Sequence, residues 1–137
     1  MEKYLEELIV LANKAYHKNE IPVGCVIVRE DKIIARAYNL RETKKDVLAH
    51  AEIIAIKKAT KALNDWRLAD CTMYVTLAPC KMCRAIIEES RISKIYYLIK
   101  NDKTETEKSL SIYEKISNEK FEEQYKKTFN KLFQKIR

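Results

Sequence analysis

Two short segments of the sequence carry residue types that could bind a metal together. The first contains His50 and Glu52, and in the second Pro79 directly precedes the pair Cys80 and Cys83. On a helix, residues three positions apart face the same side, so the two cysteine sulfurs would lie close together. Proline is well tolerated in the first turn of a helix, and a helix N-terminus favours the thiolate form that binds metals. The second segment is therefore predicted to begin a helix with both thiolates at its start.

Two thiolates and one imidazole are typical of a zinc site that keeps one coordination position open. We predict His50, Cys80 and Cys83 as the ligands, because the only other histidine, His17, lies in a predicted helix near the N-terminus. Zinc lowers the pKa of a water bound at the open position, so that hydroxide is present near neutral pH. Glu52 is predicted to face that position and to transfer protons as a general acid–base.

Each segment alone has other interpretations. A lone Cys-x-x-Cys pair also fits a redox pair or half of a structural zinc site, and a lone His-x-Glu is weaker still. Found together, with a predicted strand leading into the cysteines and a predicted helix in each segment, they match the known signature of zinc-dependent nucleobase deaminases. A non-catalytic zinc-binding or RNA-binding domain stays open as an alternative. The remaining cysteines, Cys25 and Cys71, are interpreted as packed core residues.

Hydrophobic periodicity predicts the elements that must position these side chains. Helices are predicted over residues 2–18, 50–63, 80–90 and 121–136, strands over 25–28, 33–38, 72–77 and 94–99, and loops over 39–47 and 64–70. The first two strands are joined by a short polar turn and should form a hairpin. The last two are joined through a helix and should be parallel. This order predicts an α/β domain with helices layered on a sheet, and we expect a single domain over residues 1–137.

Composition narrows the setting in which such a domain would act. The net charge is +7, which suits a polyanion such as nucleic acid, although a lysine-rich surface also occurs without such a partner. No apolar run approaches the roughly 20 residues that span a bilayer. The first residues lack the basic start and long apolar stretch of a secretion signal. We therefore expect a cytoplasmic protein without membrane contact, in which four cysteines are reduced.

Several further segments match one known family. They are Glu20–Gly24, Tyr38–Asn39, Ala49–Ile53, Trp66–Leu68, Tyr74–Leu77, Pro79–Cys80, Met82–Cys83 and Ser90–Ile92. On these motifs, from about Tyr4 to Leu110, the sequence resembles the bacterial tRNA-specific adenosine deaminases of the cytidine/deoxycytidylate deaminase superfamily.

The resemblance implies a fold, a reaction and partners. The implied fold is the three-layer α/β/α cytidine-deaminase-like fold, with a mixed sheet of four to five strands, in a homodimer. The implied reaction is the zinc-dependent hydrolysis of adenosine to inosine at the wobble position, with the tRNA anticodon arm as partner. Asn39 matches the residue that hydrogen-bonds the flipped-out base, and Val23 matches a residue that lines the base pocket. A loop-capping Asn39 and an ordinary core Val23 stay open, as does a deaminase of free cytosine, cytidine or guanine.

The sequence also departs from the family pattern near the expected site. Ala78 stands where the family usually has Glu, and Leu40 stands where it usually has Arg. Residues 100–108 replace a glycine-containing loop whose Asp contacts RNA, and Asn101 takes the position of that Asp. The segment that normally supplies a fifth strand is predicted to be shortened. These departures leave the metal motif intact and concern RNA recognition and the dimer surface.

Overall fold

The computed structural model describes residues 1–101 and 109–135. The strands are β1 (Gly24–Arg29), β2 (Lys32–Tyr38), β3 (Thr72–Leu77), β4 (Lys94–Ile99) and β5 (Ile112–Lys115). The helices are α1 (Glu2–His17), α2 (Arg41–Lys44), α3 (Ala51–Leu63), α4 (Lys81–Glu89) and α5 (Glu119–Lys135). The strands form one five-stranded sheet in the order β2-β1-β3-β4-β5.

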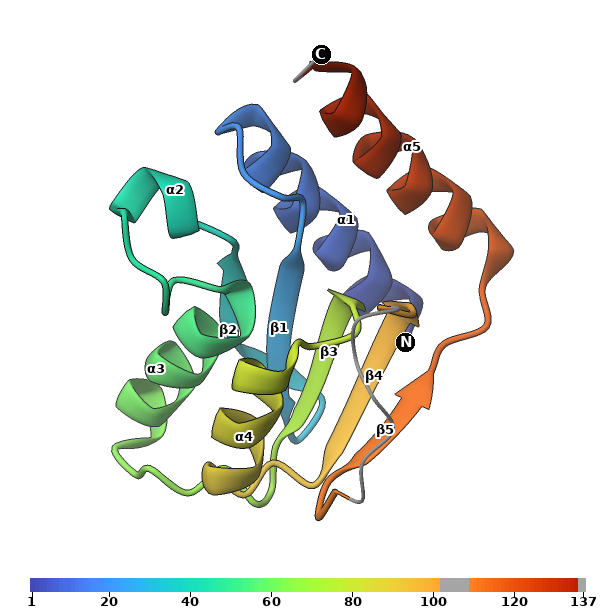
Figure 1. The fold of residues 1–137 in the computed structure, drawn as a ribbon. Helices are drawn as coiled ribbons and strands as arrows, with labels where there is room; N and C mark the ends of the chain where they lie inside the picture. Colours follow the sequence, from blue (N-terminus) through green and yellow to red (C-terminus); the bar gives the residue numbers. More distant parts are fainter. Residues whose placement is uncertain (102–108, 136–137) are drawn as a thin grey trace.

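Helices cover both faces of this sheet. Figure 1 shows α3 and α4 on one face, and α1 and α5 side by side on the other. Successive side chains of a strand point to opposite faces, so a central strand supplies two cores. Cys25 and Ile27 of β1 belong to the core under α3 and α4, whereas Val26 and Val28 belong to the core under α1 and α5. The predicted three-layer α/β/α arrangement is confirmed.

The strand directions are mixed, as predicted. β1 pairs antiparallel with β2 and with β3, whereas β3 and β4 are parallel and are connected through α4. Glu30 and Asp31 form the two-residue turn of the hairpin with φ angles of 52° and 62°, the left-handed values that a type I′ turn requires. β5 lies parallel to β4 at the edge of the sheet. The sheet therefore has five strands, the upper end of the predicted range.

Three differences from the sequence expectations concern the elements around the site. The predicted loop over 39–47 contains α2, a single helical turn. The two site helices begin one residue later than predicted, because His50 and Cys80 have extended backbone angles and occupy the N-cap positions of α3 and α4. Pro79 therefore precedes the N-cap and does not lie in the first helical turn, which corrects that prediction.

Two other expectations reach beyond what the structure describes. The departure from the family pattern over residues 100–108 is described only at 100 and 101, because 102–108 lie outside the described residues. The predicted end of the last helix at Ile136 also lies outside them.

Gly24, the only glycine of the chain, sets the close approach of α1 to the sheet. A Cβ atom at this position would lie 2.6 Å from the carbonyl oxygen of Leu8 and 2.9 Å from the Cβ of Leu11. A side chain would push the helix away from β1. Glycine thus lets the start of β1 lie directly under α1, next to the segment that enters the site.

Among the described residues, none of the helices combines the length and the hydropathy that crossing a membrane demands.

Candidate metal centre and adjoining cleft

The two predicted motifs meet at the end of the sheet where the parallel strands β3 and β4 terminate. His50 precedes α3, Cys80 precedes α4, and Cys83 lies in the first turn of α4. One ligand atom from each of these residues lies within 4.8 Å of the others. Residues separated by about 30 positions in the sequence therefore form one group that could hold a metal ion.

The distances within this group fit zinc. His50 Nδ1 lies 3.7 Å from the Sγ of Cys80 and 3.6 Å from the Sγ of Cys83. Tetrahedral zinc with bonds of about 2.0–2.1 Å to nitrogen and about 2.3 Å to sulfur places these atoms about 3.6 Å apart. In the described part of the chain, no further histidine, cysteine or acidic residue joins the group. A zinc ion held there would keep one coordination position for a ligand that is not protein.

The start of α4 prepares one cysteine for metal binding. A hydrogen bond from the Cys83 thiol, together with backbone N–H groups of Cys83 and Met82, lowers the pKa of Cys80 to about 5. The same hydrogen bond and burial raise the pKa of Cys83 in the metal-free chain. Since the thiolate is the form that binds zinc, metal binding must displace the remaining proton of the pair.

Glu52 is the carboxylate next to this group. It is the second residue of α3 and is 4% exposed, and it lines the same cleft as His50 and Cys80. Burial raises the pKa of Glu52 to about 7. A carboxyl group with this pKa can both accept and release a proton near neutral pH.

The cleft beside the metal group has a volume of about 230 Å³. Its lining consists of Ile21, Val23, Asn39, Arg41, His50, Ala51, Glu52, Leu77, Ala78, Cys80 and Asn101. These residues come from α2, from the starts of β1, α3 and α4, and from the ends of β2, β3 and β4, which meet at one end of the sheet. Both predicted substrate contacts, Asn39 and Val23, therefore line the cleft that contains Glu52.

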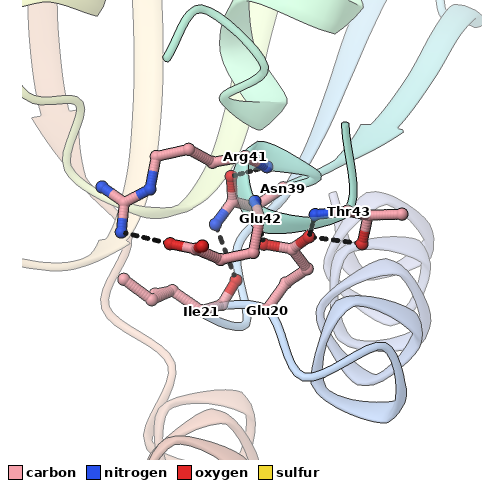
Figure 2. Close-up of polar contacts among 6 residues, drawn as sticks. All are labelled: Glu20, Ile21, Asn39, Arg41, Glu42 and Thr43. Atoms are coloured by element: carbon pink, nitrogen blue, oxygen red, sulfur yellow. Dashed lines mark hydrogen bonds and ion pairs between the residues drawn. The ribbon is translucent and has the colours of Figure 1, made fainter. Parts of the chain in front are cut away.

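Asn39 connects the cleft wall to its neighbours (Figure 2). Its side-chain Nδ2 donates to the carbonyl oxygen of Ile21 at 3.4 Å, and its Oδ1 accepts from the backbone N–H of Arg41 at 3.3 Å. Asn39 is 7% exposed, and Val23 is 9% exposed. The capping contact of Asn39 and the core packing of Val23 are both present, and neither removes the residue from the cleft wall.

Two departures from the family pattern, Ala78 and Asn101, line the cleft. The backbone N–H of Ala78 donates to Ile99 at 2.9 Å, and the Ala78 carbonyl accepts from Asn101 Nδ2 at 3.4 Å. These contacts join the ends of β3 and β4. The backbone N–H of Leu40 donates to Ala49 at 3.0 Å, next to His50. Cys25 and Cys71 are buried and are not members of the metal group.

Sequence reasoning missed the roles of Glu20 and Arg41 in this region. Arg41 lines the cleft from α2, which the sequence pattern does not indicate. Glu20 is fully buried and accepts hydrogen bonds from residues of α2. The one available signal in the sequence was the position of Glu20 directly before the apolar residues that lead into β1. A carboxylate buried there would cost free energy unless it had hydrogen-bond partners.

Comparison with known proteins identifies the family to which this arrangement corresponds. The cytidine and deoxycytidylate deaminase zinc-binding region matches residues 1–99. Over 96 residues, the chain is 49% identical to the tRNA-specific adenosine deaminase of Bacillus subtilis (strain 168). The match covers 70% of this chain, which spans about 60% of the length of that relative.

Two solved structures share the fold. One, from a study of A-to-I editing by tRNA:A34 deaminases at the wobble position of transfer RNA, has a TM-score of 0.83 and 32% identity over 93% of this chain and 99% of that chain. The other, guanine deaminase from Bacillus subtilis, has a TM-score of 0.71 and 35% identity over 75% of this chain and 66% of that chain. These matches confirm the predicted fold and the resemblance to tRNA-specific adenosine deaminases. Since the zinc-binding region spans residues 1–99 of 137, the chain belongs to the cytidine and deoxycytidylate deaminase family.

Proposed function

We propose that this protein hydrolyses adenosine to inosine at the wobble position of a tRNA, with zinc held by His50, Cys80 and Cys83. The observation that carries the proposal is that Glu52 lines one cleft with His50 and Cys80, two members of a three-residue donor group that fits zinc. The sequence identity to a tRNA-specific adenosine deaminase supports the choice of substrate.

The residues of the cleft have different roles in the proposed reaction. Bound zinc supplies a water molecule of lowered pKa for attack on C6 of adenine. Glu52 takes a proton from this water and delivers it to N1 of the ring. After the carbon–oxygen bond has formed, Glu52 takes the remaining proton of the added hydroxyl and transfers it to the leaving amine. The bond between C6 and the amine nitrogen then breaks, so that adenosine and water yield inosine and ammonia. Asn39 hydrogen-bonds the base, and Val23 packs against it.

The proposed substrate also fits the charge of the chain. A base must leave its stack to reach the cleft, which costs least in a single-stranded loop such as the anticodon loop. Contacts from lysine and arginine to phosphates supply affinity that does not depend on base identity. The net charge of +7 supports this partner, and we place the protein in the cytoplasm with its tRNA. Recovery in a membrane or secreted fraction would contradict that location.

Purified protein with bound zinc is expected to convert a stem–loop RNA with adenosine at the wobble position into the inosine form, with one ammonia released per inosine. Contacts to the remote parts of the RNA contribute to catalysis, so we expect kcat/KM for the stem–loop to exceed that for free adenosine by at least about 100-fold. Mass spectrometry of the digested RNA and an ammonia assay measure both products. The same stem–loop with guanosine at that position is the control.

A deaminase of free bases is the second candidate, because a guanine deaminase is 35% identical to this chain. Free guanine, cytosine and cytidine are therefore offered beside the RNA. Turnover of these compounds, with no inosine in the stem–loop, would replace the proposed function with this one.

We also propose that the protein acts as a homodimer. Large apolar side chains are exposed in the segments that flank α3: Val47 is 67% exposed before the helix, and Trp66 is 51% exposed after it. A second copy of the chain would cover such surface and stabilise both partners. Sedimentation equilibrium is expected to give twice the chain mass of 16.2 kDa. A monomer at micromolar concentration would contradict this proposal.

A further inference from the structure

Glu20 is a buried carboxylate that the proposed reaction does not use. It lies between α1 and β1, is 0% exposed, and does not line the cleft. Within the described residues, Glu20 forms no ion pair. A buried carboxylate is expensive unless hydrogen bonds compensate for its lost hydration. The positions of its donors therefore indicate what this residue holds together.

All three donors belong to one short segment, α2. The backbone N–H of Glu42 donates to Oε1 of Glu20 at 3.0 Å, and the backbone N–H of Thr43 donates to Oε2 at 2.6 Å. The Thr43 hydroxyl donates to the same Oε2 at 2.5 Å. Both carboxylate oxygens are thus engaged (Figure 2). Hydrogen bonds to a charged acceptor are stronger than neutral ones, and more so away from water.

The core does not hold α2 in place. This helix has four residues, Arg41–Lys44, and none of them is buried. A single helical turn is not stable by itself, because its nucleation costs more than its few hydrogen bonds return. The segment therefore depends on contacts with neighbouring residues, and the Glu20 carboxylate provides three of them.

The same segment supplies part of the cleft wall. Asn39 and Arg41 line the cleft, and Asn39 is bonded to the segment that follows Glu20 through the carbonyl oxygens of Ile21 and Val23. Residues 20–23 and 39–43 therefore lie side by side and form one wall of the cleft. We call these two segments the mouth wall. Glu20 joins the two segments at one end through residues 42 and 43, and Asn39 joins them at the other end through Ile21.

We propose that Glu20 is a positioning residue that fixes the mouth wall, and thereby Asn39 and Arg41, in the geometry that receives the substrate. The consequence for substrate rests on the proposed function. Without the carboxylate, only a fraction of the free protein has the mouth wall in the conformation that binds substrate. The apparent dissociation constant of substrate then rises in inverse proportion to that fraction. Because bound substrate restores the wall, kcat changes little.

The test compares Glu20→Gln, Thr43→Val and their combination with wild type. Glutamine keeps the size of the side chain but turns one acceptor into an amide that faces N–H donors, so KM for the stem–loop should rise about tenfold, with kcat within about twofold. Valine at position 43 removes one of the three donors and should give a smaller rise. The combined variant should fall short of the product of the two effects, because both changes break the same contact.

A matched control separates this effect from loss of charge or fold. Glu6→Gln makes the same chemical change at an exposed position of α1 and should leave KM unchanged. Zinc content should stay the same in every variant, because Glu20 forms its hydrogen bonds with Glu42 and Thr43 and not with the metal ligands. An unchanged KM in Glu20→Gln, or a loss confined to kcat, overturns the proposal.

A second measurement does not depend on turnover. Hydrogen exchange at the backbone N–H groups of Glu42 and Thr43 should accelerate in Glu20→Gln, by at least about tenfold, while exchange in β1 and β3 stays at wild-type rates. If wild type forms no inosine, the proposed function fails, and this exchange result alone decides whether Glu20 holds the mouth wall. Unchanged exchange at both N–H groups overturns the inference.

Discussion

Glu52→Gln is expected to abolish deamination while the protein keeps its zinc. Glutamine preserves the size of the side chain but cannot accept a proton from water or return one to the base. General acid–base catalysis contributes about 10²–10⁴-fold, and in the proposed reaction one residue serves two proton transfers, so kcat should fall by at least about 10³-fold. Mass spectrometry of inosine in the stem–loop measures the rate, and elemental analysis measures zinc per chain.

The same experiment decides between an enzyme and a non-catalytic zinc domain. Circular dichroism should show an unchanged fold in Glu52→Gln, because the carboxyl group lies at the start of α3 beside the cleft. A variant that retains more than about a tenth of the wild-type rate would move the acid–base role to another residue. A wild-type protein that binds zinc and RNA but releases no ammonia from any candidate substrate would support the non-catalytic alternative.

Cys83→Ser is expected to remove zinc and activity together. Cys83 is fully buried, and its sulfur lies 3.6 Å from His50 Nδ1. A serine hydroxyl stays protonated near neutral pH and is a poor zinc ligand, so dialysis should leave well under one zinc per chain. At zinc concentrations about 1,000-fold above Kd, bound metal adds about 4 kcal/mol to the free energy of unfolding. The variant should lose this increment in urea denaturation.

Another buried cysteine provides the matched control. Cys71 is 2% exposed and directly precedes β3, at the end of that strand opposite the cleft. Cys71→Ala should retain full zinc content and activity, at the cost of a small cavity. Full zinc retention in Cys83→Ser, or zinc loss in Cys71→Ala, would contradict the proposed ligand set. Chelation of wild-type zinc should abolish activity, and added zinc should restore it.

The elements with strong apolar patterning were predictable because their patterns reflect burial on one or both faces. α1 and the strands β1 to β4 match the predicted ranges within about two residues, which is the usual uncertainty of element ends. Hydrophobic periodicity predicted neither β5 nor α2. β5 has only four residues with alternating exposure, and α2 has none that is buried. Hydrophobic periodicity cannot reveal an element that buries so little apolar surface.

By itself, the sequence predicted the donor set, because cysteine and histidine at these spacings are typical of metal sites and the nearby Glu52 suits acid–base catalysis. It also indicated α/β layering and a parallel β3–β4 pair, since local patterns and connection lengths limit those choices. Only the tertiary structure decided that the ends of several strands converge on one cleft, and that Glu20 reaches across to residues 42 and 43. Such contacts depend on how segments far apart in the sequence pack together, and local sequence patterns do not indicate which distant segments meet.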